Sequence, residues 1–122
     1  MKLNPDCVRD VLLAVEENTG VHAVMEIDED DYTQYQQLKK YKYEEVAYHI
    51  VQCNLNGYFT DFAERIDNSY MIVDLSPKAH EFIANIRSDT NWKKIKEKAL
   101  TIGSFSLSVL ADIAKKIILS QF

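Results

Sequence analysis

The chain has 122 residues, a length typical of one domain, and 47% of them are hydrophobic, which is enough for a core. Only 3 glycines and 2 prolines occur, so the composition favours a helix-rich chain over a linker. No apolar run approaches the roughly 20 residues that cross a bilayer. The N-terminus also lacks the layout of a signal peptide. We therefore expect a cytoplasmic protein with no membrane contact.

The formal net charge of -5 is unevenly distributed. Residues 1–45 hold 5 basic and 11 acidic side chains, whereas residues 46–122 hold 9 basic and 8 acidic ones. An acidic front half argues against attraction of nucleic acid to the whole surface. The most basic segment is 87–98, with 5 basic and 2 acidic residues, so a local basic patch stays compatible with the sequence.

The first third of the chain predicts a helix, a strand and a loop. Asn4-Pro5 opens the helix as a cap and first-position proline, and the helix ends near residues 18–20. Its predicted buried stripe is Val8, Val11, Leu12 and Val15. Residues 21–27 predict a short strand. The acidic run 28–31 lacks the spacing of an EF-hand and predicts a solvated loop. Residues 32–43 fit either a degenerate helix or an irregular loop.

Residues 44–56 have helical periodicity and are followed by Gly57, which suits a helix end. Glu44 and Glu45 lie in the first turn, where the helix dipole favours negative charge. The predicted buried stripe is Val46, Ala47, Ile50 and Cys53, widened by Val51 and Leu55. The opposite, polar face is expected to carry Tyr48, His49, Gln52 and Asn56, of which the last three project together.

The next segment predicts a hairpin and another helix. Residues 58–66 and 70–75 are aromatic and β-branched strand formers around the turn residues 67–69. Ser76 and Pro77 then start a helix as N-cap and first residue. Its predicted buried face is Ala79, Phe82, Ile83 and Ile86.

Two further helices are predicted at the C-terminal end. Ser88 caps the first, with Lys93, Lys94, Lys96 and Lys98 mostly outward and with the buried stripe Trp92, Ile95, Ala99 and Ile102. Gly103 breaks it. The last helix, 107–122, buries Leu107, Leu110, Ala111, Ala114, Ile117 and Ile118. Val109, Ile113, Leu119 and Phe122 add apolar surface off that face, which must be buried elsewhere.

Together these elements predict an α+β, winged-helix-like fold. The order is helix, short strand, helix and a β-hairpin wing over 58–75, with two or three additional C-terminal helices. We expect one domain, 1–122, made of a core over 1–87 and a helical extension over 88–122.

The residues favour no catalytic or metal chemistry. Cys7 and Cys53 lie on apolar helix faces, which predicts small buried hydrophobes. Of the three histidines, none has the spacing of a metal site, and no cofactor is expected. His80-Glu81 suits a general acid–base pair, but we favour a His80 that borders the core and bonds a backbone or tyrosine group. We therefore expect no enzyme.

Several segments carry a family resemblance: LNPDCVRD at 3–10, YHI at 48–50, QCNL at 52–55, DLSPK at 74–78, HEFIANIRSDTNW at 80–92 and GSFSL at 103–107. Through them the chain resembles the uncharacterised bacterial and phage family called domain of unknown function 2513, over nearly its whole length. Where that family commonly has glycine before the histidine, this chain has Ala79. The resemblance implies a phage or mobile-element association and winged-helix character, and it implies no settled activity.

Two functions follow as hypotheses. The first is a regulatory module that binds a protein partner, or a second copy, through the C-terminal helix. The alternative is a sequence-specific DNA-binding regulator of the helix-turn-helix class. His49, Gln52 and Asn56 would then meet base edges beside Tyr48, while Arg65, Lys93 and Lys94 would hold phosphates. The negative charges of Glu44 and Glu45, at the helix end that usually approaches DNA, argue against this alternative.

Overall fold

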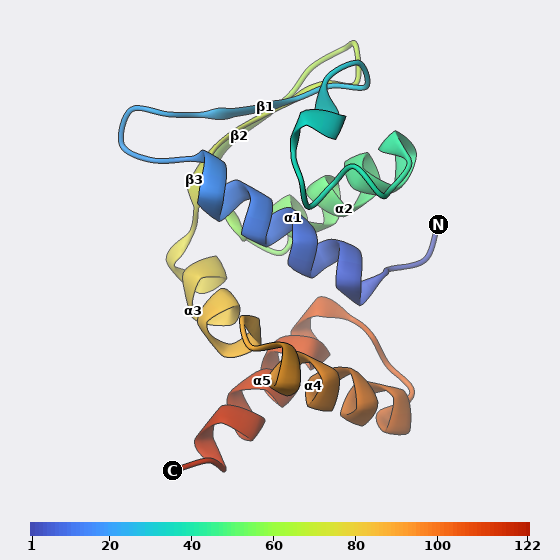
Figure 1. The fold of residues 1–122 in the computed structure, drawn as a ribbon, viewed down its shortest axis with the longest axis vertical. Helices are drawn as coiled ribbons and strands as arrows, with labels where there is room; N and C mark the ends of the chain where they lie inside the picture. Colours follow the sequence, from blue (N-terminus) through green and yellow to red (C-terminus); the bar gives the residue numbers. More distant parts are fainter.

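A computed structural model describes residues 1–122 as an α+β fold with five α-helices and one three-stranded antiparallel sheet (Figure 1). The helices are α1 (Pro5–Asn18), α2 (Tyr43–Leu55), α3 (Pro77–Ile86), α4 (Asp89–Ile102) and α5 (Leu107–Leu119), and a single 3-10 turn η1 covers Tyr32–Gln34. The strands are β1 (Met25–Ile27), β2 (Phe59–Glu64) and β3 (Tyr70–Leu75).

Side-chain caps begin the helices where the sequence predicts them. Asn4, Ser76 and Ser88 each accept a backbone N–H of the first turn of α1, α3 and α4. These oxygens satisfy amides that have no partner inside the helix. At the other end of α4, Gly103 has φ 85° and donates its N–H to two carbonyls of the last turn, as the predicted break requires.

The strand order β1-β3-β2 confirms the predicted hairpin and places β1 beside it as a third strand. Phe59 faces Leu75 at one end of the hairpin, and Met25 faces Ile72 across the other edge of β3. The first strand is shorter than predicted. Val21 is 94% exposed, and residues 20–23 form a turn outside the sheet. Strand pairing starts at Met25, the first side chain of this segment that is buried.

The hairpin turn uses the predicted polar residues. Asn68 adopts φ 61°, and the Asp67 carboxylate accepts hydrogen bonds from the N–H and hydroxyl of Ser69. These bonds to the ionised carboxylate lower the pKa of Asp67.

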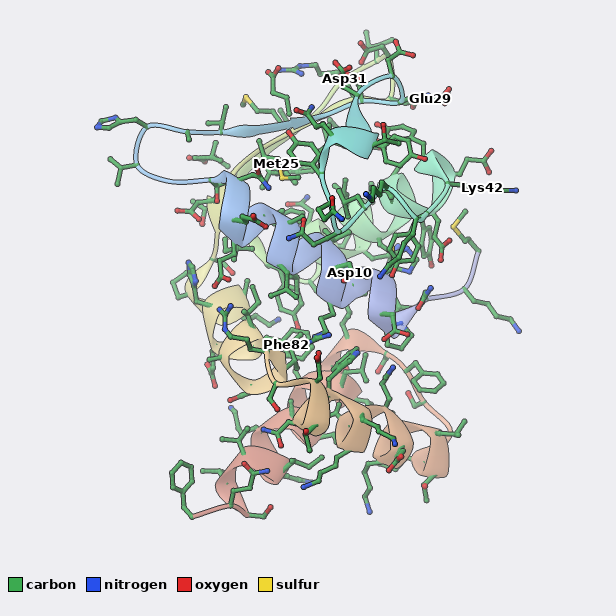
Figure 2. The ribbon with its side chains drawn as sticks, viewed as in Figure 1. Asp10, Met25, Glu29, Asp31, Lys42 and Phe82 are labelled. Carbon is green, nitrogen blue, oxygen red and sulfur yellow. The ribbon has the colours of Figure 1, made fainter.

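Residues 28–42 form an irregular loop that contains η1, the second of the two predicted alternatives. Tyr41 and Lys40 both bind Asp10 on α1, at 2.6 and 3.0 Å, and Leu38 is fully buried. The loop is thus fastened to α1 through Asp10. Glu29 and Asp31 lie at the end of the molecule away from the C-terminal helices (Figure 2).

One continuous core runs from α1 to α5, and it includes the predicted buried faces of α1 and α3. Met25 points from the sheet towards α1, while Phe82 lies where α3 meets the C-terminal helices (Figure 2). The predicted buried stripe of α4 includes Ile102, but this residue is 54% exposed, so that part of the prediction is wrong. None of the helices has the length and apolar character of a membrane span.

Arg9 on α1 binds the segment where α3 ends and α4 begins. Its guanidinium donates to the carbonyls of Ile86 and Arg87 at 3.0 and 2.7 Å, and pairs with Asp89 at 2.8 Å. It also lies over the ring of Trp92, 5.9 Å from the centroid. The junction between α3 and α4 is therefore fixed on α1, and α4 and α5 form the end of the molecule opposite η1 (Figure 1).

Candidate functional site

The orientation of α2 differs from the sequence-based prediction. Its buried residues are Tyr43, Val46, His49, Ile50 and Cys53. His49 is 0% exposed, so the prediction that it projects with Gln52 and Asn56 is wrong. Leu55, assigned to the buried stripe, is 71% exposed instead. The apolar spacing through residues 46, 50 and 53 also passes through residue 49, which places the imidazole inside.

Two backbone groups satisfy the His49 ring. Nε2 accepts the N–H of Asn4 at 2.8 Å, so the ring proton is assigned to Nδ1, which donates to the carbonyl of Glu45 at 2.7 Å. The Asn4 side chain donates to the Glu45 carboxylate at 2.9 Å. Burial lowers the pKa of His49, which keeps the ring neutral. His49 therefore fastens the start of α1 to α2.

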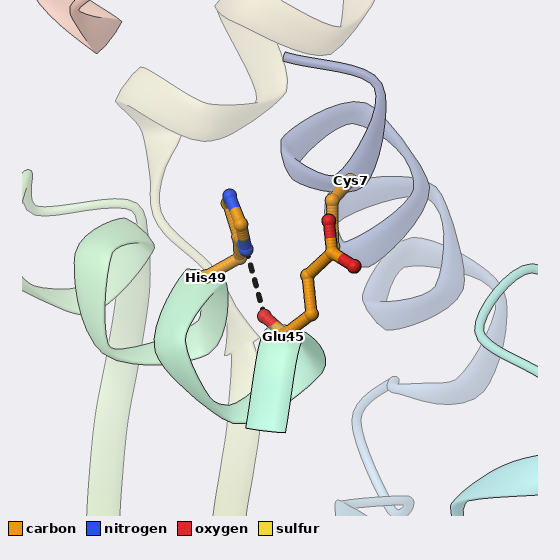
Figure 3. A group of neighbouring side chains, drawn as sticks. All are labelled: Cys7, Glu45 and His49. Atoms are coloured by element: carbon orange, nitrogen blue, oxygen red, sulfur yellow. Dashed lines mark hydrogen bonds between the residues drawn. The ribbon is translucent and has the colours of Figure 1, made fainter. Parts of the chain in front are cut away.

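Cys7, Glu45 and His49 form a cluster whose possible ligand atoms lie within 4.8 Å of one another (Figure 3). Figure 3 shows the Glu45 carboxylate turned towards Cys7 and the His49 ring bonded to the Glu45 carbonyl. The cluster does not fit a metal ion in this arrangement. Both imidazole nitrogens already have partners, and burial raises the pKa of the Cys7 thiol to about 12. Cys53 is buried too, as predicted for both cysteines.

Gln52 and Asn56 lie at the C-terminal end of α2. The Asn56 side chain donates to the carbonyl of Gln52 at 2.8 Å and so caps its own helix. Its backbone carbonyl accepts the ammonium of Lys78 on α3 at 2.8 Å. Asn56 is thus engaged in holding α2 to α3, and of the predicted pair only Gln52 has a side chain without such a bond.

The predicted basic residues lie apart from one another. Arg65 follows β2 in the hairpin turn and pairs with Glu26 at 3.1 Å. Lys93 and Lys94 are exposed on α4, at the opposite end of the molecule (Figure 1). The structure therefore does not bring Arg65 together with the two lysines. His80 is exposed on α3, so the favoured prediction of a His80 that borders the core is wrong.

A groove of about 540 Å³ lies between α2 and the hairpin turn. Tyr48 and Val51 lie along its α2 side, with Tyr43 and Tyr70 contributing further apolar surface. The charged residues at its edge are all acidic, namely Glu29, Glu44 and Asp67, and no lysine or arginine lines it. We call this surface, with Leu55 one turn beyond Val51, the acidic face.

A second groove of about 730 Å³ lies between α4 and α5. Its apolar side chains are Ile102, Ile113 and Ile117. Three lysines line it, Lys94, Lys98 and Lys116, against the single acidic residue Glu97. We call this surface the lysine groove.

Sequence reasoning missed most residues of both surfaces. The sequence pattern predicts Val51 and Leu55 in the core, although residues 44, 48, 51 and 55 also share one helical face. This second helical face is the pattern from which the exposed side of α2 can be predicted. Lys98 and Lys116 were not singled out, because only the packing of α5 on α4 places them around one groove.

The fold and these surfaces define a small α+β protein with a three-stranded antiparallel sheet, five helices and two oppositely charged grooves. Residues 2–106 match the family model described as "Hypothetical protein (DUF2513)", and the chain belongs to that family, as the sequence resemblance implied. No curated protein and no solved structure matches the chain. The family match ends one residue before α5 begins.

Proposed function

We propose that this protein is a winged-helix-like, protein-binding regulatory module whose acidic face is the contact surface. The element order α1, β1, α2, β2, β3 and the strand order β1-β3-β2 support the winged-helix arrangement, with the loop around η1 between β1 and α2. The single observation that carries the binding proposal is the composition of the outward side of α2.

That side offers apolar and acidic groups to a partner. Tyr48 and Val51 are half-buried, Leu55 is 71% exposed, and Glu44 stands at the start of the helix. Half-buried aromatic and aliphatic groups are what a protein interface desolvates. Because duplex DNA carries dense negative charge, a face edged by Glu29, Glu44 and Asp67 repels it. A protein segment with basic and apolar side chains suits the same face.

The first experiment is site-specific photo-crosslinking in cells. A photoreactive residue at Val51 is expected to give a discrete protein adduct, whereas one at Val21, exposed in the turn before β1, is expected to give none. Adducts at both positions, or at neither, would contradict the proposal.

The second experiment tests the DNA alternative directly. The affinity for mixed-sequence duplexes is measured at several salt concentrations, with Lys93→Glu/Lys94→Glu as a matched variant. We expect no duplex binding whose affinity increases as the salt concentration is lowered. Salt-dependent binding that this variant abolishes would favour DNA over a protein partner.

A further inference from the structure

The acidic face and the lysine groove have opposite charge and complementary apolar surface. The lining of the acidic face holds three carboxylates and no basic residue, and that of the lysine groove holds three lysines and one glutamate. Both have apolar side chains between the charged ones. Each surface therefore has the chemistry expected of a binding site for the other.

A helix and a groove are available for the contact. On the outward side of α2, Glu44, Tyr48, Val51 and Leu55 follow one another at spacings of four, three and four residues, and the first three also form the α2 side of the groove beside the hairpin turn. The lysine groove is a depression between two packed helices, α4 and α5. An amphipathic helix laid in a groove between helices is a recurrent mode of recognition. Its charged ends then fix the register.

Pairing like surfaces is unfavourable. Two acidic faces would bring Glu29, Glu44 and Asp67 against their own copies, and two lysine grooves would oppose their ammonium groups. Like charges placed together across an interface repel each other and oppose association. A symmetric dimer that uses either surface twice is therefore disfavoured.

The two surfaces lie towards opposite ends of the molecule, with α2 beside the sheet and η1 and with α4 and α5 at the other end (Figure 1). One copy therefore cannot close the contact on itself. A contact between unlike surfaces is repeated by each added copy, which gives a ring or an open chain.

We propose that copies of this protein associate head to tail, with the acidic face of one copy seated in the lysine groove of the next. This inference rests on the proposed function, because it uses the same face of α2, and it names a second copy as the partner. Residues Glu44, Val51 and Leu55 meet Lys94, Lys98 and Ile117 of the neighbouring copy.

Two variants block the two surfaces separately. Glu44→Lys/Leu55→Lys reverses a charge of the acidic face and replaces an apolar side chain by a charged one. Lys94→Glu/Lys98→Glu reverses two charges of the lysine groove. All four side chains are exposed, so both variants are expected to fold. Val21→Lys, at a residue on neither surface, is the control.

Sedimentation velocity from about 10 μM to about 1 mM, a range that reaches weak affinities, measures the assembly. We expect the wild-type mass to rise above 14.1 kDa with concentration and to fall as salt screens the contact. The control should behave like the wild type, and each double variant alone should be monomeric. An equal mixture of the two should form a dimer that does not extend, because one intact face and one intact groove remain.

A wild-type protein that stays monomeric over this range would overturn the inference, as would a mixture that remains monomeric. Dimers in either double variant alone would show a symmetric contact and overturn it too. These failures are separable from failure of the proposed function. A monomer that still gives a discrete heavier adduct from Val51 has a different protein partner, whereas a monomer without an adduct contradicts both.

Discussion

His49 is a polar side chain that serves the fold from inside the core. It accepts the N–H of Asn4 and donates to the carbonyl of Glu45, so both of its ring nitrogens have a partner. A buried polar group left without a partner costs about 1–3 kcal/mol. The neutral ring therefore stabilises the start of α1 against α2 only while it holds a single proton.

This predicts a pH-dependent stability. The pKa of His49 is lower in the folded protein than in the unfolded chain, so unfolding takes up a proton in acid. The contribution is complete above the unfolded value of about 6.5 and is lost as pH falls through the folded pKa. Urea unfolding of the wild type from pH 8 to pH 5 should show this loss.

His49→Gln is the matched variant, because its amide can still accept the N–H of Asn4. At pH 8 it should cost about 1 kcal/mol for the lost bond to Glu45. Below pH 6.5 its free energy of unfolding should fall less than that of the wild type. Parallel pH curves for the two proteins would assign the pH dependence to other groups.

A second residue-scale prediction concerns the Cys7, Glu45 and His49 cluster. Since its imidazole is engaged and its thiol is protonated, added Zn²⁺ should leave the melting temperature unchanged, and so should a chelator. A metal bound only by the folded state at 100 times its Kd would add about 2.7 kcal/mol of stability. A rise in melting temperature with Zn²⁺ that Cys7→Ala abolishes would contradict the arrangement described.

The face presented by α2 was the part of the structure that sequence reasoning predicted worst. Apolar residues occur on two sides of this helix, so periodicity alone supports either orientation. The choice depends on His49, whose polarity suggested exposure. Its burial follows from an N–H at Asn4, 45 residues away in the chain, and such a partner leaves no trace in local pattern.

Helix ends and the hairpin were predicted well, because each is set by a residue with a local mechanism. Asn4, Ser76 and Ser88 cap helices with their own side chains, and Asn68 takes the turn conformation that its residue type tolerates. The two grooves were not predictable in this way, because each is assembled from elements that only tertiary packing brings together.

Gly57, between α2 and β2, gives a prediction at the level of elements. It has φ 75°, and a Cβ added there would meet no atom within 4 Å. Gly57→Ala should therefore cost about 1–2 kcal/mol through backbone strain alone. Gly20→Ala is the control, since its site is equally open and has no such φ. Urea midpoints that fall equally in both variants would contradict this account.

For the whole molecule, α5 is part of the core as well as a lining of the lysine groove. Leu107, Leu110, Ile113 and Ala114 are buried against α3 and α4. Large core side chains contribute about 2–5 kcal/mol each, and a domain is stable by only about 5–15 kcal/mol in total. Loss of α5 therefore threatens the fold itself.

Truncation after Gly103 is accordingly expected to abolish cooperative unfolding and to expose apolar surface that binds a hydrophobic dye. Truncation after Leu119 removes only three exposed residues and should leave the melting curve unchanged. A cooperatively folded protein without α5 would contradict its structural role. Point variants in the lysine groove are therefore the sounder test of self-association.

The bonds of Arg9 also have a consequence for synthesis in the cell. The carbonyl of Ile86 that this guanidinium binds is 77 residues further along the chain. At a translation rate of about 5–20 residues per second, the ribosome makes α1 roughly 4–15 seconds before that partner exists. During this interval α1 can already pack against α2, which is made earlier, but its contacts with α3 and with the carbonyl of Ile86 cannot form. The side of α1 that packs against α3 therefore stays uncovered in the nascent chain until α3 has been made.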